Sequence, residues 1–286
     1  MPKTVAINAF KPTGKLHIGN YVGAIPPVLR LADRYEHCYV MIADYHALNT
    51  VRNPTELKDD SYSIAATLLA CGLNPERTCL YRQSDIPELL ELSVLLTTVT
   101  PKGLMDRAHA YKAAMDKNKE EGRGDPDYGV NMGLYTYPIL MTADILAPGG
   151  TIVPVGKDQV QHIEMARDIA GYFNNTFKPV FALPGYQLEK DGAILPGIDG
   201  RKMSKSYNNH IPVFIDSAAR KKLVMKIVTD SKLPAEPKNP DENVIFQLYM
   251  HFATAEEITA MRDAFAKGGM GYGDAKLALF EVLERA

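Results

Sequence analysis

Two short stretches carry side chains suited to holding a polyphosphate. Residues 12–20, PTGKLHIGN, follow a strand-like run and open a helix, with glycines that let the backbone approach a ligand and side-chain donors from His17 and Asn20. Residues 202–206, KMSKS, supply two lysines and two hydroxyls some 185 residues later. Each motif is weak alone. The pair, in this order, predicts a grip on a polyphosphate from two sides.

Alternating strands and helices must position these stretches. Short β-prone runs predict strands at residues 4–10, 38–43, 78–81 and 151–155. Helices are predicted at residues 54–69 and 88–96, after residue 159, and after residue 18 with a bend or restart at Pro26-Pro27. This order predicts a Rossmann-like, doubly wound parallel sheet with its ligand site at the carboxyl ends of the strands. Asp44, His46 and Gln83 directly follow predicted strands, and we expect them to face that site.

A further helix, at residues 131–146, contains Pro138 and places Tyr137, Met141 and Asp144 on one stripe. A carboxylate among apolar side chains needs a partner when it is buried, so the stripe fits either a ligand pocket or ordinary core with a charge at the helix end. Asp158 and Gln159 begin the helix that follows the last predicted strand. That position favours contact with an anionic or hydroxyl-rich ligand.

The remaining segments outline a second domain. Residues 112–127 are charged and contain glycine, which fits either a solvated linker or a mobile lid. Beyond Pro184 we expect a long, glycine-rich loop that must move. After residue 206 only helices are predicted, at residues 216–229, 244–252, 255–266 and from about 274. We therefore expect a catalytic domain at residues 1–206 and a smaller all-helical domain at residues 207–286, whose uncapped last helix looks truncated. A basic cluster near Arg220 fits a solvated face or a phosphate-backbone contact.

Composition narrows the class of protein. The chain has 286 residues, of which 46% are hydrophobic and 23% charged, and this is typical of a globular protein with a sizeable core. No apolar run approaches the roughly 18 residues of a membrane span and no signal-peptide pattern is present, so we expect a cytoplasmic protein without a membrane partner. A net charge of −2 gives no overall attraction to nucleic acid. Three unevenly spaced cysteines disfavour disulfides and a cysteine metal site.

The two motifs, taken together, resemble the paired signatures of class I aminoacyl-tRNA synthetases. PTGKLHIGN is similar to their HIGH-type signature, with Asn20 in the last place, and KMSKS matches their second signature letter for letter. The resemblance runs the length of the chain. The segments ADYHALNT, RQSDIPE, TYPILMTADIL, VPVGKDQVQHIEMARDIA and GIDGRKMSKS look like the tryptophanyl-tRNA synthetase family.

This resemblance implies roles for particular residues. Catalytic roles at the transferring phosphate and the pyrophosphate fall on His17, Asn20, Lys202 and Lys205. ATP binding falls on Lys11, Pro12, Thr13, Gly14, Gly19, Asn20, Gly156, Lys157, Asp158, Ile194, Lys202, Met203, Ser204, Lys205 and Ser206. Amino-acid binding falls on Ile7, His46, Tyr137, Met141, Asp144, Val153, Val155 and Gln159, with Asp144 accepting the indole N–H.

The implied reaction joins L-tryptophan to ATP as an adenylate and then to the 3′ end of tRNA(Trp). The resemblance also implies Mg²⁺ bound with ATP but no dedicated protein metal site, and a homodimer formed through the helices near residues 88–96. An apolar slot with one buried acceptor rejects side chains that cannot donate there, because the acceptor would be left unpaired.

Several residues depart from the family pattern, and they define the alternatives. An aromatic residue is usual at the position of Ile7, a glycine at that of Ala9 and a glutamine at that of Lys11. Residues 146–150 read LAPGG in place of a leucine-leucine-aromatic run, and Val94 stands where tryptophan is common. A tryptophan-activating synthetase is the first hypothesis. A paralogue that activates another aromatic acid, or uses another acceptor, is the second. A non-catalytic binding module is the third, although it would not need both phosphate-gripping stretches.

Overall fold

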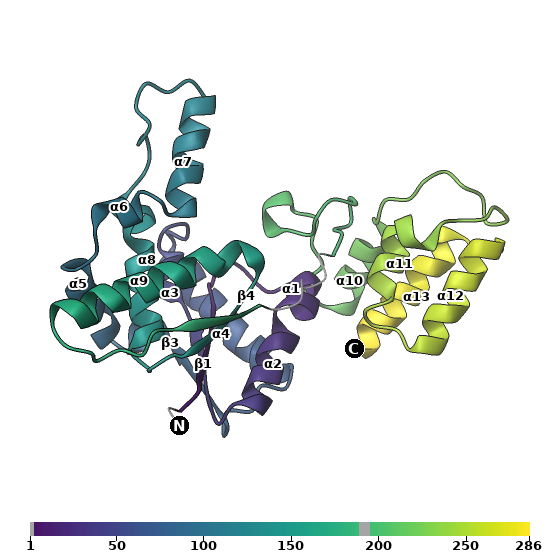
Figure 1. Ribbon diagram of the computed structural model, residues 1–286. Helices are drawn as coiled ribbons and strands as arrows, with labels where there is room; N and C mark the ends of the chain where they lie inside the picture. The colour runs from purple at the N-terminus through teal and green to yellow at the C-terminus, as the bar shows by residue number, and fades with distance from the viewer. Residues whose placement is uncertain (1–2, 189–194) are drawn as a thin grey trace. The chain divides into compact units, whose positions relative to one another are not determined.

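The computed structural model describes residues 3–188 and 195–286, which fold into two compact units. The first unit comprises Met1–Gly14 and Pro27–Asp191, and the second comprises Lys15–Pro26 and Gly192–Ala286. Figure 1 shows the sheet in the first unit and a group of helices in the second. The first unit is built on a parallel sheet, as the alternation of strands and helices predicted.

Five parallel strands form the sheet, in the order β3-β2-β1-β4-β5. They are β1 (Val5–Phe10), β2 (His37–Ile42), β3 (Thr78–Arg82), β4 (Ile152–Val155) and β5 (Gly185–Leu188). The chain winds outward from β1 in both directions, and right-handed crossovers then place helices on both faces. Figure 1 shows helices on either side of the strands. The predicted doubly wound fold and its first four strands are confirmed.

The fifth strand was not predicted, because the chain beyond Pro184 was expected to be loop. β5 has four residues at the sheet edge, and Tyr186 and Leu188 remain exposed. A strand this short, without a buried apolar face, owes its structure to pairing with β4 rather than to its own sequence. The loop prediction was therefore wrong for these four residues.

Helices of the first unit follow the predicted pattern closely. The bend predicted at Pro26-Pro27 is confirmed as a break at Ala24, since a short helix ends there and a second one begins. The helices and 3-10 turns up to residue 176, apart from α7, are α1 (Ile18–Gly23), α2 (Ile25–Arg34), α3 (Asp44–Ala47), α4 (Pro54–Ala70), η1 (Gln83–Asp85), α5 (Glu88–Thr97), α6 (Lys102–Met105), α8 (Met132–Leu146), η2 (Lys157–Gln159) and α9 (Val160–Thr176). Leu96, Ile139 and Ile169 join α5, α8 and α9 in one apolar core.

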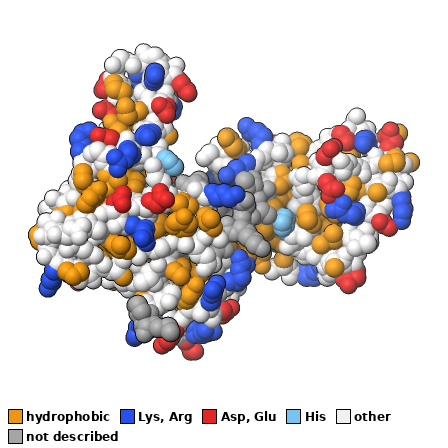
Figure 2. Space-filling view, in the orientation of Figure 1, with side chains coloured by type: hydrophobic (Ala, Val, Ile, Leu, Met, Phe, Trp, Pro, Cys, Tyr) orange, Lys and Arg blue, Asp and Glu red, His pale blue; other side chains and the backbone are white. Residues whose placement is uncertain are grey.

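The charged stretch at residues 112–127 is mostly helical, which corrects the loop prediction. α7 (His109–Glu120) ends just before Gly122, whose positive φ of 67° suits glycine. The Tyr111 hydroxyl donates to Asp127 at 2.7 Å, and Asn118 donates to two backbone carbonyls beyond the helix at 2.8 Å each. Good helix formers in the run, and a return loop tied by Asn118, explain the result. In Figure 1 this arm extends away from the sheet, and in Figure 2 it carries both acidic and basic side chains.

The second unit is helical after residue 206, as predicted. Its elements there are η3 (Lys205–Tyr207), α10 (Ser217–Met225), η4 (Pro240–Glu242), α11 (Val244–Tyr249), α12 (Ala255–Lys267) and α13 (Tyr272–Arg285). Phe246, Phe265 and Leu279 are fully buried in its core. α10 stops before the predicted residue 229, because the Val228 amide donates instead to the Ile198 carbonyl at 2.8 Å. The basic cluster includes Arg220, which pairs with Glu284 at 2.6 Å and is held inside this unit.

The compact units do not divide where the predicted boundary after residue 206 lies. Ile18 from α1 and Met203 from the second signature are buried in the helical unit's core. The Ile18 amide donates to the Ile211 carbonyl at 2.9 Å, and the Val213 amide donates to the Leu16 carbonyl at 3.0 Å. Residues 15–20 of the first signature and all of the second therefore belong to the second unit, although they are far apart in the sequence, while residues 12–14 belong to the first unit.

The structure contains no helix, within its described residues, that is long and apolar enough to cross a membrane. Cys38 is buried, Cys71 is half-buried and Cys79 is exposed, and all three are free thiols. Cys38 and Cys79 lie in the neighbouring strands β2 and β3. The cysteines are thus ordinary core or near-surface thiols, as their spacing predicted.

Candidate active site

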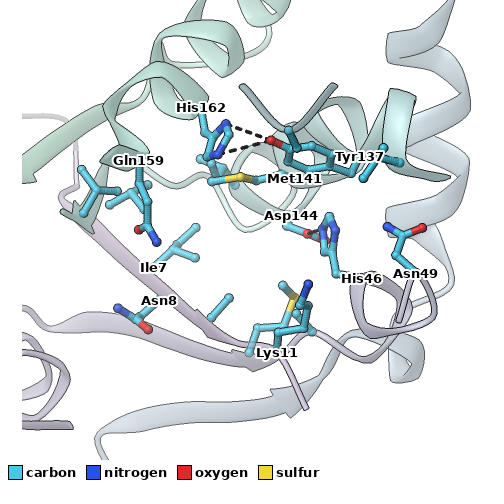
Figure 3. Close-up of a pocket in the computed structure, with 18 of the residues that line it drawn as sticks. Ile7, Asn8, Lys11, His46, Asn49, Tyr137, Met141, Asp144, Gln159 and His162 are labelled. Atoms are coloured by element: carbon cyan, nitrogen blue, oxygen red, sulfur yellow. Dashed lines mark hydrogen bonds and ion pairs between the residues drawn. The ribbon is translucent and has the colours of Figure 1, made fainter. Parts of the chain in front are cut away.

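A cavity of about 580 Å³ opens at the carboxyl ends of the strands in the first unit. β1, α3, α8, β4 and η2 each contribute side chains to its wall. All eight side chains predicted to bind an amino acid line it, namely Ile7, His46, Tyr137, Met141, Asp144, Val153, Val155 and Gln159. Figure 3 shows these elements around the open space, with Asp144 beside His46. A cavity of this size, with an apolar wall and several polar side chains, suits a small organic ligand.

Asp144 is the buried acidic group of this cavity, and its carboxylate is held by two side chains. His46 Nε2 lies 2.9 Å from Asp144 Oδ2, and Gln83 Nε2 lies 2.8 Å and 3.0 Å from the two oxygens. Because an ionised carboxylate only accepts hydrogen bonds, these contacts place the proton of His46 on Nε2. The carboxylate retains further lone pairs toward the cavity that it lines.

Asp44 and Gln83 lie behind the cavity wall, although we expected both to face the site. Gln83 is fully buried, and Asp44 accepts from the Ser84 hydroxyl at 2.5 Å and the Ser84 amide at 3.0 Å. They join the ends of β2 and β3 to each other. Of the three polar residues that follow these strands, only His46 lines the cavity.

Beside His46, whose ring centroid lies 6.4 Å from that of Tyr137, the cavity wall carries this phenol and a second imidazole. The Tyr137 hydroxyl lies 3.3 Å from both ring nitrogens of His162, and the rings meet edge to face at 5.4 Å (Figure 3). Burial raises the pKa of Tyr137, so its hydroxyl stays protonated at neutral pH. Sequence reasoning missed His162. The signal for it was its place on α9, one helical turn after Gln159.

The departures at Ile7 and residues 146–150 meet in this wall. A Cβ atom added to Gly150 would collide with Ile7 Cδ1 and would lie 2.6 Å from the Ile145 carbonyl oxygen. The isoleucine thus packs into the space that the glycine leaves. Ile7 and Gly150 therefore pack directly against each other.

A second cavity, of about 560 Å³, brings the two signatures together within the helical unit. It is lined by His17, Gly19, Asn20, Gly23, Ala24, Leu195, Lys202, Met203, Ser204, Ser206 and Tyr207. A Cβ on Gly19 would lie 3.0 Å from the His17 ring, so glycine lets the ring fold over the start of α1. Asn20 Oδ1 accepts from the His17 amide at 3.1 Å, which leaves the amino end of this side chain to donate to a ligand.

Asn209, which sequence reasoning did not single out, shapes the second signature. It is almost fully buried, accepts from the Ser204 amide at 2.8 Å, and donates to Asp199 at 2.7 Å and to the Lys202 carbonyl at 3.1 Å. The Met203 side chain is buried in the core. The lysines of the second signature therefore lie on a loop whose backbone is held by hydrogen bonds to the Asn209 side chain.

His17 and His210 are adjacent in this unit, with ring centroids 5.8 Å apart. Within the described residues, neither buried Nδ1 atom has a hydrogen-bond partner. Burial lowers the pKa of His17 from 6.5 to about 4, and the nearby charges of His210 and Lys205 add to this effect. The pKa of His210 is lowered as well, by burial and Lys205. Both rings are consequently neutral donors or acceptors at neutral pH, and positive charge comes from the lysines.

Lys205 belongs to the second unit but is not one of the residues that line the second cavity, and most of the other residues predicted to bind ATP lie in the first unit. Lys11 lines the cavity around Asp144, and the Gly14 amide donates to the buried Asp60 carboxylate at 2.5 Å. Pro12 is buried beside Thr13, while Gly156 and Lys157 lead from β4 into η2. Ile194 and the side chain of Asp158 lie outside the described residues. Within the described part of the chain, no three His, Cys, Asp or Glu side chains cluster closely enough to hold a metal ion.

Comparison with known proteins identifies the class that this fold and site define. Residues 3–286 match the family of class I tRNA synthetases for tryptophan and tyrosine (W and Y), and the chain belongs to this family. A tryptophan–tRNA ligase from Neisseria meningitidis is 50% identical over 280 residues, which are 98% of this chain and 83% of that protein. A tryptophan–tRNA ligase from Pseudomonas aeruginosa is also 50% identical, and the match covers 98% of this chain but 63% of that protein.

The solved structures agree with the sequence relatives. Tryptophanyl-tRNA synthetase from Campylobacter jejuni, determined with ADP and tryptophan, is 38% identical, with a TM-score of 0.89 over 99% of this chain and 85% of that one. The tryptophan-specific members of the family, more than the tyrosine-specific ones, are therefore what this chain is similar to. The family recognised from the two signatures is confirmed.

Proposed function

We propose that this chain activates L-tryptophan with ATP and transfers the tryptophanyl group to the 3′ end of tRNA(Trp). The observation that carries the proposal is the buried Asp144 carboxylate in an apolar cavity lined by all eight predicted amino-acid residues. The 50% identity to a tryptophan–tRNA ligase, over 98% of the chain, supports it.

The ring of the amino acid occupies the apolar wall of this cavity, and its N–H donates to Asp144. Phenylalanine and tyrosine rings carry no such N–H. Binding phenylalanine would leave the carboxylate with an unmet acceptor, which a site built around a hydrogen bond rejects strongly. Tyr137 lies beside His46 and Gln159 lies across the cavity from it (Figure 3), and both line the cavity, where they can meet the amino group.

The first chemical step needs no side-chain nucleophile. A carboxylate oxygen of the amino acid attacks the α-phosphorus of ATP, and the bond to the leaving pyrophosphate breaks, which gives an aminoacyl-adenylate. In the second cavity, His17 and Asn20 supply neutral N–H donors to the transferring phosphate, and Lys202, together with Lys205 on the same loop, offsets the charge on the pyrophosphate. Mg²⁺ bound to the ATP phosphates supplies further charge neutralisation. The fixed backbone of the signature loop, anchored by Asn209, keeps the lysines in place.

In the second step, a hydroxyl oxygen of the terminal tRNA nucleotide attacks the carbonyl carbon of the adenylate. The aminoacyl group is transferred to that oxygen, and AMP leaves. This partner is supported by the family to which the chain belongs, whose members are tRNA synthetases. A protein that charges tRNA works where translation takes place, and we place it in the cytoplasm.

The chain forms a homodimer through α5. Leu90, Val94 and Leu95 on this helix are 40%, 67% and 54% exposed, which leaves an apolar face for a second copy to cover. Light scattering should give twice the chain mass for the wild type, and Leu95→Asp should give the monomer mass. A monomeric wild type at working concentration would contradict the dimer without affecting the proposed chemistry.

ATP–pyrophosphate exchange across a panel of amino acids tests the function directly. Exchange with tryptophan alone supports the proposal. Exchange with another aromatic acid would mean that the Ile7 and Gly150 changes have altered the selection, and no exchange with any acid would leave only a binding module. Charging of a tRNA(Trp) transcript then tests the second step.

A further inference from the structure

Gln83 stands out among the buried polar side chains of the first unit because it contacts the selective carboxylate without lining the cavity. It is fully buried, whereas Asp144 faces the cavity. Gln83 therefore cannot touch a bound amino acid and can act on it only through Asp144.

The orientation of the Gln83 amide follows from its neighbours. Its Oε1 atom lies 3.0 Å from the Tyr45 amide nitrogen and 3.4 Å from the His46 amide nitrogen, and these groups only donate hydrogen bonds. Its amino group must then point toward Asp144, where it reaches both oxygens at 2.8 Å and 3.0 Å. The opposite orientation would set donors against donors and a carbonyl oxygen against a carboxylate.

The support under Gln83 is itself locked. The first turn of α3 has no side-chain cap of its own, so Gln83 from η1 supplies the acceptor for its amides. In return, Asp44 at the start of α3 accepts from the backbone and hydroxyl of Ser84 in η1. These turns end the paired strands β2 and β3. The two contacts tie the strand ends together and leave the glutamine little freedom.

We propose that Gln83 is a positioning residue for amino-acid selection: it holds the Asp144 carboxylate in the one orientation in which it accepts the ring N–H of the substrate. This inference rests on the proposed function, since it assumes that Asp144 accepts that N–H. His46 contacts one oxygen of the carboxylate, and Gln83 contacts both. Removing Gln83 therefore frees the carboxylate to rotate about its remaining partner.

The test compares tryptophan with β-(benzothienyl)alanine, which has a ring of similar shape with sulfur in place of the N–H. In pyrophosphate exchange, the ratio of kcat/KM for the two substrates reports the hydrogen bond alone. We expect Gln83→Met, which keeps the length of the side chain without its amide, to lower this ratio about tenfold. The KM for ATP and the parameters for the benzothienyl substrate should change little.

Gln83→Glu provides a second variant of the same shape. It sets a carboxylate against Asp144, among the titratable groups His46, Asp44, Tyr81 and Arg82 that surround the pair. Like charges in contact raise the pKa of one of them, and the protonated form donates as the glutamine did. We expect the ratio to recover as the pH is lowered in this variant. Gln161→Glu, the same change at a glutamine outside the cavity, should leave the ratio unaltered at every pH.

The possible outcomes distinguish a failure of the proposed function from a failure of the role of Gln83. A wild-type chain that does not distinguish the two substrates overturns the role of Asp144, and with it the proposed function and this inference. Clear discrimination by the wild type that persists undiminished in both Gln83 variants overturns the role of Gln83 alone. An equal loss with both substrates would show that Gln83 serves only the fold.

Discussion

The surroundings of Asp144 in the first unit and of His17 in the second differ in how fully their polar groups are paired. Asp144, Gln83 and Asp44 all have hydrogen-bond partners inside the protein. In contrast, within the described chain, His17 and His210 each bury an Nδ1 atom that has none. An unpaired buried polar atom costs about 1–3 kcal/mol. The site that we propose for amino-acid selection is thus paired in advance, whereas the site that we propose for phosphate keeps unpaired polar atoms that a ligand can meet.

The largest effect should come from the charge carried by the signature loop. Lys205→Ala removes a cation that stabilises the departing pyrophosphate, and we expect kcat for pyrophosphate exchange to fall by about 10²–10³. Direct binding of tryptophan to the other unit should change little. Lys267→Ala removes an exposed lysine that pairs with Asp263 one turn away, and it should be neutral. Equal losses in exchange and in tryptophan binding would contradict the division of labour between the units.

Asp144→Asn should show the opposite pattern of effects, with a change in tryptophan binding. One carboxylate oxygen becomes an amino group facing the donors Gln83 and His46, so we expect the KM for tryptophan to rise roughly 10- to 100-fold, as for a lost hydrogen bond to a charged group. The KM for ATP should stay near the wild-type value. Asp168→Asn, an exposed aspartate on α9, is the matched control. A mutant that loses ATP affinity instead would show that the cavity has been misassigned.

Packing in the cavity wall predicts the next effect. Gly150→Ala forces a methyl group against Ile7 and the Ile145 carbonyl, and overpacking of this kind costs about 1–3 kcal/mol in the free energy of unfolding. Gly171→Ala, in α9 with open space around it, should instead stabilise the protein by about 0.5–1 kcal/mol. Denaturant unfolding measures both. If the two substitutions changed stability in the same direction, the direct packing of Ile7 against Gly150 would be contradicted.

The smallest effect is the pH dependence of stability. The pKa of His17 is depressed to about 4, so the unfolded chain binds more protons than the folded one between about pH 4 and 6.5. Acidification through this window lowers the free energy of unfolding, with a slope of at most about 1.4 kcal/mol per pH unit for one proton. His17→Asn should flatten the slope, while the exposed His109→Asn should not. An unchanged slope in the first variant would remove His17 as its source.

Elements whose signals are local in the sequence were predictable, and elements that depend on contacts with distant residues were not. Four strands and most helices were predictable because their apolar patterns are local, and the stripe of Tyr137, Met141 and Asp144 followed from helical spacing. β5 was not, since pairing with β4 holds it in place. Helix α7 has a local signal in its helix formers and in Gly122, but the charged composition of this segment favoured the prediction of a loop.

The site shows the same limit. Eight of the residues that line the first cavity were predicted as amino-acid-binding through the family resemblance, whereas His162 was missed. The role of Gln83 depends on hydrogen bonds to residues at least 37 positions away, and that of Asn209 on hydrogen bonds to residues as few as five positions away. The sequence pattern identifies neither set of partners. Gln83 follows a strand, which suggested a side chain facing the ligand. Only its contacts reveal that it supports the wall from behind.

The pairing between Leu16, Ile18 and residues 211–213 also bears on how the protein is made. His17 and its strand partner Pro212 are separated by almost 200 residues of chain. At about 5–20 residues per second, a ribosome takes roughly ten to forty seconds to synthesise that length. The backbone contacts of Leu16 and Ile18 therefore cannot form until residues 211–213 have been synthesised. During that interval, a nascent chain can already complete much of its sheet.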